Sequence, residues 1–199
     1  MIDFTGKKVI IFGGGAVGAR KARYFMDEAE VLVYSRSFHA DLLDLPVFKQ
    51  EMTLVRDISP ICSLIRDSEL VIAATSDPEI NASIRDACRK EGILCNVAAG
   101  PAGDVVLPAK ICGKRYTIGI STHGSVPAVS RLIREQVEEL LPNPDALIDL
   151  GDWIRSEFRN TNAGYDRILH DALRDPRTHA ELSAGLDQAK RYVREQYAT

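Results

Sequence analysis

Three glycines near the start of the chain restrict its fold more than any other feature. Residues 9–12 (VIIF) form an apolar, largely branched run that is typical of a strand buried on both faces. Gly13, Gly15 and Gly18 follow at the spacing G-x-G-x-x-G, just before a helical pattern. Such glycines permit a tight turn, let the backbone approach a diphosphate and let the helix pack closely on the strand. Because the amides at a helix N-terminus attract anions, this strand, glycine loop and helix together predict a dinucleotide site. The alternative is a glycine-rich turn without a ligand.

Strand and helix patterns alternate through the first 97 residues. Apolar runs at 30–35 (EVLVYS), 69–75 (ELVIAAT) and 93–98 (ILCNVA) predict further strands. Asp77 and the proline after it are typical of a helix start, and Gly92 is typical of its end. Strands that alternate with helices form a parallel sheet that binds ligands outside the carboxyl ends of its strands. We therefore expect an α/β fold of the Rossmann type, with a doubly wound parallel sheet.

The pattern changes after about residue 100. Two extended segments, 104–111 (DVVLPAKI) and 115–121 (RYTIGIS), flank a Gly113-Lys114 turn and suit a hairpin. Residues 125–142 predict an amphipathic helix. Its apolar stripe consists of Val129, Leu132, Ile133, Val137, Leu140 and Leu141. We expect this stripe to pair with its copy in a homodimer.

The last part of the chain, from about residue 145, is charged and helical in pattern. Its expected buried face consists of Trp153, Ile154, Phe158, Ile168, Leu169 and Leu173. The sequence thus divides into an NAD(P)-binding domain at 1–113, a dimerisation segment at 114–144 and a small helical C-terminal domain at 145–199.

Composition excludes several classes of protein. The net charge of −3 gives no sign of a nucleic-acid partner or of attraction to an anionic membrane. No apolar run approaches the roughly 20 residues that span a bilayer. The N-terminal stretch MIDFTGKKV has no signal-peptide core, so a cytoplasmic location is expected.

The cysteines give no sign of a metal site. Cys62, Cys88, Cys95 and Cys112 include no C-x-x-C pair, and the four histidines are scattered. Cys88 and Cys95 lie in helical and strand patterns and are expected to be buried free thiols.

The residues after the second predicted strand bear on the choice of nucleotide. An NAD site usually has an acid there, which binds the ribose hydroxyls. This chain has Ser35, Arg36 and Ser37 instead. Arg36 suits the 2′-phosphate of NADP, and it equally suits stacking on adenine or exposure to solvent. On this feature alone NADP is favoured over NAD.

Four stretches stand in the same order and at similar spacing as in one known family. They are GGGAVGARKA at 13–22, LVIAATSDPEIN at 70–81, CNVA at 95–98 and ISTHGSVPAVSRLIREQVE at 120–138. In these motifs the chain resembles the precorrin-2 dehydrogenases of sirohaem synthesis, which occur alone or as the N-terminal part of sirohaem synthases. The resemblance covers about residues 4–142, and the tail fits only loosely.

The resemblance implies an NAD-dependent oxidation of precorrin-2 to sirohydrochlorin, in the synthesis of sirohaem or another modified tetrapyrrole. Members of this family also lack the acid after the second strand and are generally regarded as using NAD. The resemblance therefore favours NAD, with NADP as the alternative. Cofactor contacts are expected at Gly13, Gly15, Ala16, Val17, Gly18, Arg36, Ser37 and Thr75.

Precorrin-2 is a polycarboxylate, so its enzyme needs cationic donors around the cleft. Residues 109–135 hold Lys110, Lys114, Arg115, Arg131 and Arg134 against the single acid Glu135. Substrate contacts are expected at Arg131 and Arg134 and in the polar turn Ser121, Thr122, His123 and Gly124, which precedes a helix N-terminus. The alternative is that Arg131 and Arg134 form i,i+4 pairs with Glu135 and Glu138.

One departure from the family pattern concerns the chemistry. Many members carry an aspartate where this chain has Ala99, and that acid is implicated in dehydrogenation and in iron insertion by bifunctional members. Without a carboxylate base there, no useful ferrochelatase activity is expected. Asp104 and His123 are the nearest candidates for a catalytic group, and we expect neither to be indispensable.

Two other functions fit part of the pattern. The first is an NAD-binding sensor or regulatory domain without catalysis, which the missing acid favours and the basic segment disfavours. The second is a Rossmann dehydrogenase that acts on another small substrate, although no Asp-His or Lys base stands at the predicted strand ends.

Overall fold

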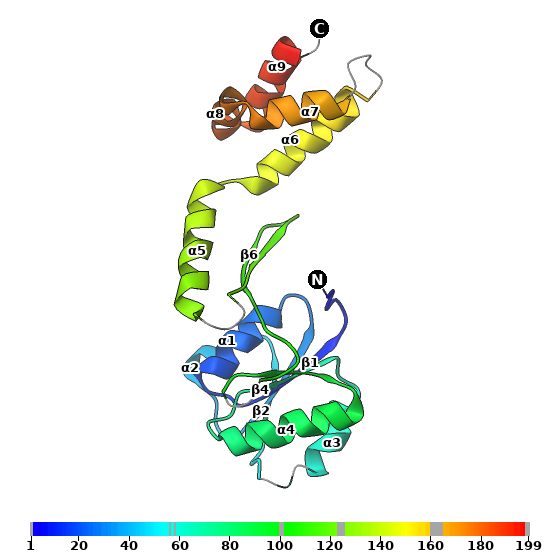
Figure 1. Ribbon diagram of the computed structural model, residues 1–199, viewed down its shortest axis with the longest axis vertical. Coiled ribbons are helices and arrows are strands. Elements are labelled where there is room, and N and C mark those ends of the chain that lie inside the picture. Colours follow the sequence, from blue (N-terminus) through cyan, green and yellow to red (C-terminus); the bar gives the residue numbers. More distant parts are fainter. Residues whose placement is uncertain are drawn as a thin grey trace. The chain divides into compact units, whose positions relative to one another are not determined.

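The chain forms two compact units, residues 1–107 and 108–199 (Figure 1). The computed structural model describes residues 2–55, 57, 59–99, 102–122, 126–159 and 165–197. The boundary lies just before the hairpin segment, so both of its strands belong to the second unit. The three-part division at residues 113 and 144 stays a prediction.

Five parallel strands form the sheet of the first unit, in the order β3-β2-β1-β4-β5. They are β1 (Lys8–Phe12), β2 (Glu30–Ser35), β3 (Phe48–Glu51), β4 (Leu70–Ala73) and β5 (Leu94–Val97). The order changes direction between β1 and β4, where Phe12 pairs with Tyr34 on one side and with Ala73 on the other. Ligands of doubly wound sheets bind at such a switch point. The predicted Rossmann-type fold is confirmed.

Helices cover both faces of this sheet (Figure 1). They are α1 (Ala16–Phe25), α2 (Ala40–Leu43), α3 (Ser59–Ile65) and α4 (Pro78–Glu91). Val9 and Ile11 of β1 pack in a core with α1 and α2, whereas Ile10 and Phe12 pack in a core with α3 and α4. Burial on both faces explains why the central strands read as continuous apolar runs.

The helix predicted after Asp77 has the predicted ends. The Asp77 carboxylate accepts a hydrogen bond from the backbone N–H of Glu79 at 2.8 Å, which satisfies an otherwise unpaired amide of the first turn of α4. Gly92 ends α4 with a φ of +71°, a left-handed conformation that favours glycine. Local sequence signals alone therefore set both ends of this helix.

Cys88 and Cys95 are fully buried in the core beneath α4 and carry free thiols, as predicted. A hydrogen bond with Cys95 and burial raise the pKa of Cys88, so this thiol stays protonated. Cys62 is partly buried and Cys112 exposed. Among the described residues, no group of His, Cys, Asp and Glu has the arrangement of a metal site.

The second unit consists of a hairpin and five helices within the described ranges. The hairpin pairs β6 (Ala109–Cys112) with β7 (Thr117–Ile120) in antiparallel register, as predicted for the two extended segments. The helices are α5 (Pro127–Leu140), α6 (Pro144–Glu157), α7 (Tyr165–Arg174), α8 (Pro176–Ala184) and α9 (Leu186–Tyr197). None of the helices in the described part of the chain is both long and apolar enough to cross a membrane.

The C-terminal helices enclose their own core. Leu150, Ile154, Phe158, Ile168 and Val193 are among its buried members. Of the predicted buried face, Ile154, Phe158 and Ile168 are buried, and Trp153, Leu169 and Leu173 pack against them partly buried. The periodicity of the tail thus predicts its packing correctly.

A cluster of acids on α6 holds the turn of the hairpin. Asp145 accepts hydrogen bonds from the backbone N–H groups of Lys114 at 2.9 Å and Arg115 at 3.0 Å. The guanidinium of Arg115 donates to Asp149 at 2.9 Å and also to Asp152. Arg115, one of the cations considered for the substrate, is therefore engaged by two carboxylates of its own unit.

Lys21 lies on α1 with its side chain partly removed from water. Lost hydration lowers its pKa to about 8, and the charge of Arg20 acts in the same direction. The folded protein therefore bears the cost of a poorly hydrated ammonium below about pH 8. Because the ordinary value is 10.5, this cost declines as the pH rises from about 8 to 10.5 and is absent above that range.

Replacing Lys21 with methionine should stabilise the fold at neutral pH by roughly 1 kcal/mol, since a thioether of similar length has no charge to hydrate. Urea unfolding of both proteins at one concentration should give a larger difference near pH 7 than near pH 10. A gain of equal size at both pH values would show that the ammonium charge is not its cause.

Candidate functional site

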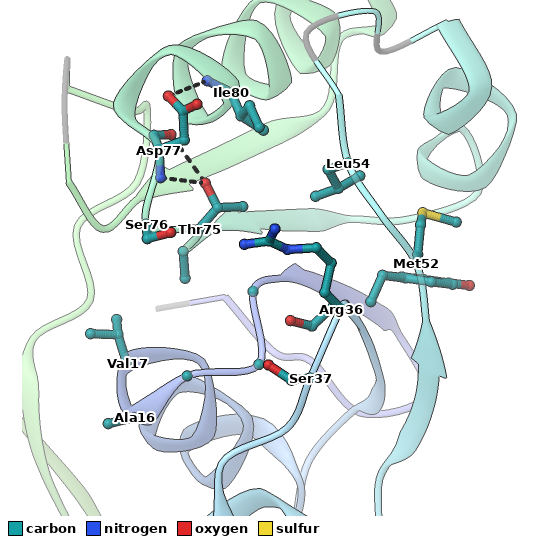
Figure 2. Close-up of a pocket in the computed structure, with 16 residues that line it drawn as sticks. Ala16, Val17, Arg36, Ser37, Met52, Leu54, Thr75, Ser76, Asp77 and Ile80 are labelled. Carbon is teal, nitrogen blue, oxygen red and sulfur yellow. Dashed lines mark hydrogen bonds between the residues drawn. The ribbon is translucent and has the colours of Figure 1, made fainter.

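A cavity of about 600 Å³ lies at the carboxyl ends of the strands in the first unit (Figure 2). Its walls come from the loop between β1 and α1, from the segments after β2 and β3, and from the loop between β4 and α4. The residues that line it are Gly13, Gly14, Gly15, Ala16, Val17, Tyr34, Ser35, Arg36, Ser37, Met52, Leu54, Ala74, Thr75, Ser76, Asp77 and Ile80. The cavity occupies the switch point of the sheet, where this fold binds its ligand.

The predicted glycines have different structural roles. Gly13 has a φ of +121°, and a Cβ there would lie 2.2 Å from the carbonyl oxygen of Ala74. A Cβ on Gly18 would lie 1.9 Å from the carbonyl oxygen of Gly13, so this glycine lets α1 start directly beside the end of β1. Gly18 does not line the cavity. A Cβ on Gly15 would meet no atom within 4 Å, which leaves this backbone open to a ligand.

The start of α1 is suited to an anion. Gly15 is the N-cap residue, and no side chain among the described residues caps the helix or adds an acid to its first turn. The first amide N–H groups of a helix have no partner within the helix, and its dipole favours negative charge there. Ala16 and Val17, both predicted contacts, line the cavity at this point. The geometry therefore suits a diphosphate.

Gly14 is a site residue that the spacing rule overlooks. A Cβ there would lie 2.4 Å from the carbonyl oxygen of Ser37, and its own carbonyl accepts a hydrogen bond from the His39 N–H at 2.7 Å. Gly14 therefore holds the segment after β2, which carries Arg36 and Ser37, against the glycine loop. Its place in the middle of the GGG run at 13–15 is the signal that could identify it.

Arg36 gives the cavity its cationic group. Figure 2 shows its side chain extending from the end of β2 toward Thr75. Among the described residues that line the cavity, Asp77 is the only acid. Its carboxylate accepts hydrogen bonds from the N–H groups of Glu79 and Ile80 in α4. The described residues that line the cavity thus include no acid in the segment directly after β2, in agreement with the sequence.

Asp104 lies apart from this cavity. Its backbone N–H donates to the carbonyl of Cys95 at 2.7 Å, and its carboxylate lies 3.6 Å from Nε of Arg89, in the last turn of α4. Ala99, at the position of the family aspartate, is exposed just beyond β5. His123 and Gly124 lie outside the described residues. The catalytic roles of Asp104 and His123 stay predictions.

Other predicted substrate residues lie in the second unit. Thr122 and Ser130 share a hydrogen bond at 2.9 Å between their hydroxyl oxygens, which ties the end of the hairpin to α5. Ser121 is exposed in the same segment. The roles of these residues in substrate binding stay predictions.

Arg131 and Arg134 form the pairs that the sequence suggested as the alternative. Nε of Arg131 lies 3.1 Å from Glu135, and Arg134 donates to Glu138 at 2.6 Å. All four side chains are at least partly exposed, and Arg131 is 78% exposed. Exposed pairs contribute little stability, so the guanidinium of Arg131 stays available to a competing carboxylate, whereas Arg134 is 28% exposed and more closely held.

Comparisons with known proteins agree with this geometry. A family model described as "Putative NAD(P)-binding" matches residues 1–109, which include the first unit and the whole cavity. A precorrin-2 dehydrogenase from Methanosarcina barkeri is 40% identical over 165 residues, which cover 80% of this chain and 73% of the relative.

Longer relatives match in one part only. Siroheme synthase 1 from Aeromonas hydrophila is 36% identical over 138 residues, which are 68% of this chain and 29% of that protein. The solved structure of SirC, a precorrin-2 dehydrogenase, superposes with a TM-score of 0.66 at 18% identity and covers 98% of both chains. It therefore shares the fold. From the identity and coverage of the Methanosarcina relative, together with the matched NAD(P)-binding model, the chain belongs to the precorrin-2 dehydrogenase family.

Proposed function

We propose that this protein oxidises precorrin-2 to sirohydrochlorin with NAD⁺, as a step in the synthesis of sirohaem or another modified tetrapyrrole. The observation that carries the proposal is the glycine-lined cavity at the switch point of a chain in this family. Bound NAD⁺ supplies the acceptor for a hydride from the reduced macrocycle. The products are sirohydrochlorin, NADH and a proton.

The protein's own contribution is to hold the two reactants in register. Gly15 leaves room for the diphosphate, and the first amides of α1, at Ala16 and Val17, stabilise its charge. Arg36, Ser37 and Thr75 bind the adenosine side. NAD is the proposed cofactor. Arg36 leaves NADP as the alternative, because none of the described cavity residues in the segment after β2 is an acid that would repel a 2′-phosphate.

Substrate carboxylates are proposed to bind the segment made of Ser121, Thr122, His123 and Gly124, together with Arg131 and Arg134. On substrate binding, each arginine would release its glutamate partner on α5 and bind a carboxylate of the macrocycle instead. The partial exposure of these pairs favours that replacement.

The proton released on oxidation needs no dedicated carboxylate in this proposal. Ala99 offers no base, and Asp104 is paired with Arg89 away from the cavity. Water or a substrate carboxylate is the proposed proton acceptor, and neither Asp104 nor His123 is indispensable. The absence of a base at position 99 is also our reason to propose that the protein does not insert iron.

A homodimer and a cytoplasmic location complete the proposal. The apolar stripe of α5 is exposed in the single chain: Leu132 is 53% exposed and Leu140 77%. Exposed large apolar side chains gathered on one helix favour a protein contact, and a two-fold pairing of α5 would bury them. Four free cysteines, two of them in contact in the core, suit a reducing compartment.

The proposed activity predicts a spectral change on adding NAD⁺ to the protein with precorrin-2 under anaerobic conditions. Sirohydrochlorin and NADH should form in equal amounts, and the Asp104→Asn variant should keep most of the activity because this acid lies outside the cavity. Adding Fe²⁺ or Co²⁺ to the product should give no faster metal insertion than without protein. No oxidation with either NAD⁺ or NADP⁺ would refute the proposed function.

Replacing Gly15 with alanine should separate binding from folding. The new methyl group meets no atom within 4 Å in the free protein, so unfolding free energy should change by less than about 1 kcal/mol. Affinity for NAD⁺ should fall about tenfold or more, because the methyl group stands between the loop and the diphosphate. Calorimetric titration and urea unfolding measure the two quantities.

The matched control is Gly18→Ala, whose methyl group would lie 1.9 Å from the Gly13 carbonyl oxygen. This variant should lose roughly 3 kcal/mol of unfolding free energy or fail to fold. A Gly15→Ala variant that binds NAD⁺ as tightly as the parent would contradict the assignment of this loop.

Light scattering at micromolar concentration should give a dimer for the parent and a monomer for Leu132→Asp, since the substitution buries a charge in the proposed contact. Arg131→Gln makes the same change of charge on the opposite side of α5 and should stay dimeric. A monomeric parent would rule out the dimer.

A further inference from the structure

Asn81 is a fully buried polar side chain at the carboxyl ends of β4 and β5. Its Oδ1 accepts hydrogen bonds from the backbone N–H of Thr75 at 3.0 Å and from the Thr75 hydroxyl at 2.8 Å. Its Nδ2 donates to the carbonyl of Thr75 at 3.1 Å and to the carbonyl of Ala99 at 3.1 Å. The carboxamide therefore uses both of its donors and accepts twice.

These bonds connect the wall of the cavity to the loop after β5. Thr75 lines the cavity and lies against the glycine loop, since a Cβ on Gly13 would be 2.9 Å from its nitrogen. Ala99 lies just beyond β5, where the backbone N–H of Ala98 still donates to the carbonyl of Ala73 at 2.9 Å. Asn81 thus joins the segments that follow β4 and β5, and the first of these packs against the glycine loop after β1.

Only a carboxamide satisfies this environment. Two carbonyl oxygens face its nitrogen and accept from it, while the Thr75 N–H donates to its oxygen. The Thr75 hydroxyl also lies 3.0 Å from the Asp77 carbonyl, so it has a second acceptor within reach. A carboxylate has no donor to offer, and an apolar side chain of similar size leaves the partly buried N–H and carbonyl of Thr75 without the partners that Asn81 provides. The hydrogen bonds at this position therefore favour asparagine.

We propose that Asn81 is a positioning residue for the dehydrogenation, one that fixes the backbone at Ala99, just after β5, relative to the bound dinucleotide. A dinucleotide crosses the switch point between β1 and β4, so its far end passes the strand ends that Asn81 joins. This inference rests on the proposed function, because it assigns Asn81 to the reaction proposed for this cavity.

Asn81→Asp is the variant that tests the inference. At about pH 8 its carboxylate keeps the acceptor for Thr75 but turns a negative oxygen toward the carbonyls of Thr75 and Ala99. With NAD⁺ and precorrin-2 saturating, kcat should fall about 100-fold, the scale expected when reacting groups are misplaced by an ångström. The affinity for NAD⁺, measured by calorimetry without precorrin-2, should fall less than kcat does.

A pH profile separates positioning from simple loss of structure. Burial and the facing carbonyls raise the pKa of the introduced carboxyl, so acidification should return a donor to this site. The ratio of variant to parent kcat should therefore rise at least about fivefold between pH 8 and pH 5.5, because the protonated carboxyl makes one of the lost bonds again. A ratio independent of pH would overturn the inference.

Ile84→Ala is the matched control on the same helix. Ile84 is fully buried one turn further along α4 and belongs to the apolar core, so its loss destabilises the helix without touching Thr75 or Ala99. Its kcat should stay within about twofold of the parent at matched folded fraction. An equal fall of kcat in both variants would assign the effect to the stability of α4 and overturn the inference.

Two further measurements keep the test decisive. Should Asn81→Asp fail to fold near pH 8, Asn81→Ala removes the same bonds without burying a charge, and a parent-like kcat in this variant overturns the inference. The parent is assayed in parallel: an inactive parent refutes the proposed function, whereas an active parent with an equally active Asn81→Asp variant refutes only the role of Asn81.

Discussion

The site depends on a close approach between backbones that only glycine permits. The carbonyl of Gly13 occupies the place where a side chain on Gly18 would begin, and the carbonyl of Ala74 occupies the place for a side chain on Gly13. As a result, β1, α1 and the loop after β4 meet within van der Waals distance, and the amides of α1 open into the cavity. Gly14 brings in the segment after β2 in the same way, through the carbonyl of Ser37. Gly15 alone of these positions faces open space, which leaves it for the ligand.

Much of this arrangement could be predicted because it follows from local chemistry. Asp77 and Gly92 mark the ends of α4 through hydrogen bonding and a left-handed φ, both of which short sequence patterns reveal. The apolar runs of β1 and β4 predict a sheet buried on both faces, and the sheet observed has that form. The glycine spacing locates the cavity for a related reason: Gly13 and Gly18 stand where another backbone leaves no room for a Cβ, and Gly15 leaves its own backbone open.

What could not be predicted depends on contacts between distant segments. Met52 and Leu54 line the cavity, but they follow the short strand β3, whose sequence FKQE has no apolar periodicity. Asn81 falls on the buried side of α4, where a helical pattern identifies it only as a polar residue within the apolar stripe. Its hydrogen bond to Ala99, 18 residues further along the chain, is not evident from that pattern. The ion pair of Asp104 with Arg89, 15 residues earlier on α4, is likewise not evident from the sequence, and the catalytic role of Asp104 stays a prediction.

The substrate role proposed for the arginines of α5 would let an acidic protein offer cations to a polyanion. Arg131 and Arg134 each hold a glutamate one turn away on the same exposed helix. In the proposed role, binding is an exchange of one counter-ion for another, and the empty surface stays locally neutral. A neutral surface exerts no long-range pull on nucleic acids or other abundant polyanions, so selectivity for the macrocycle would arise from the spacing of its acid groups rather than from the strength of an electrostatic field.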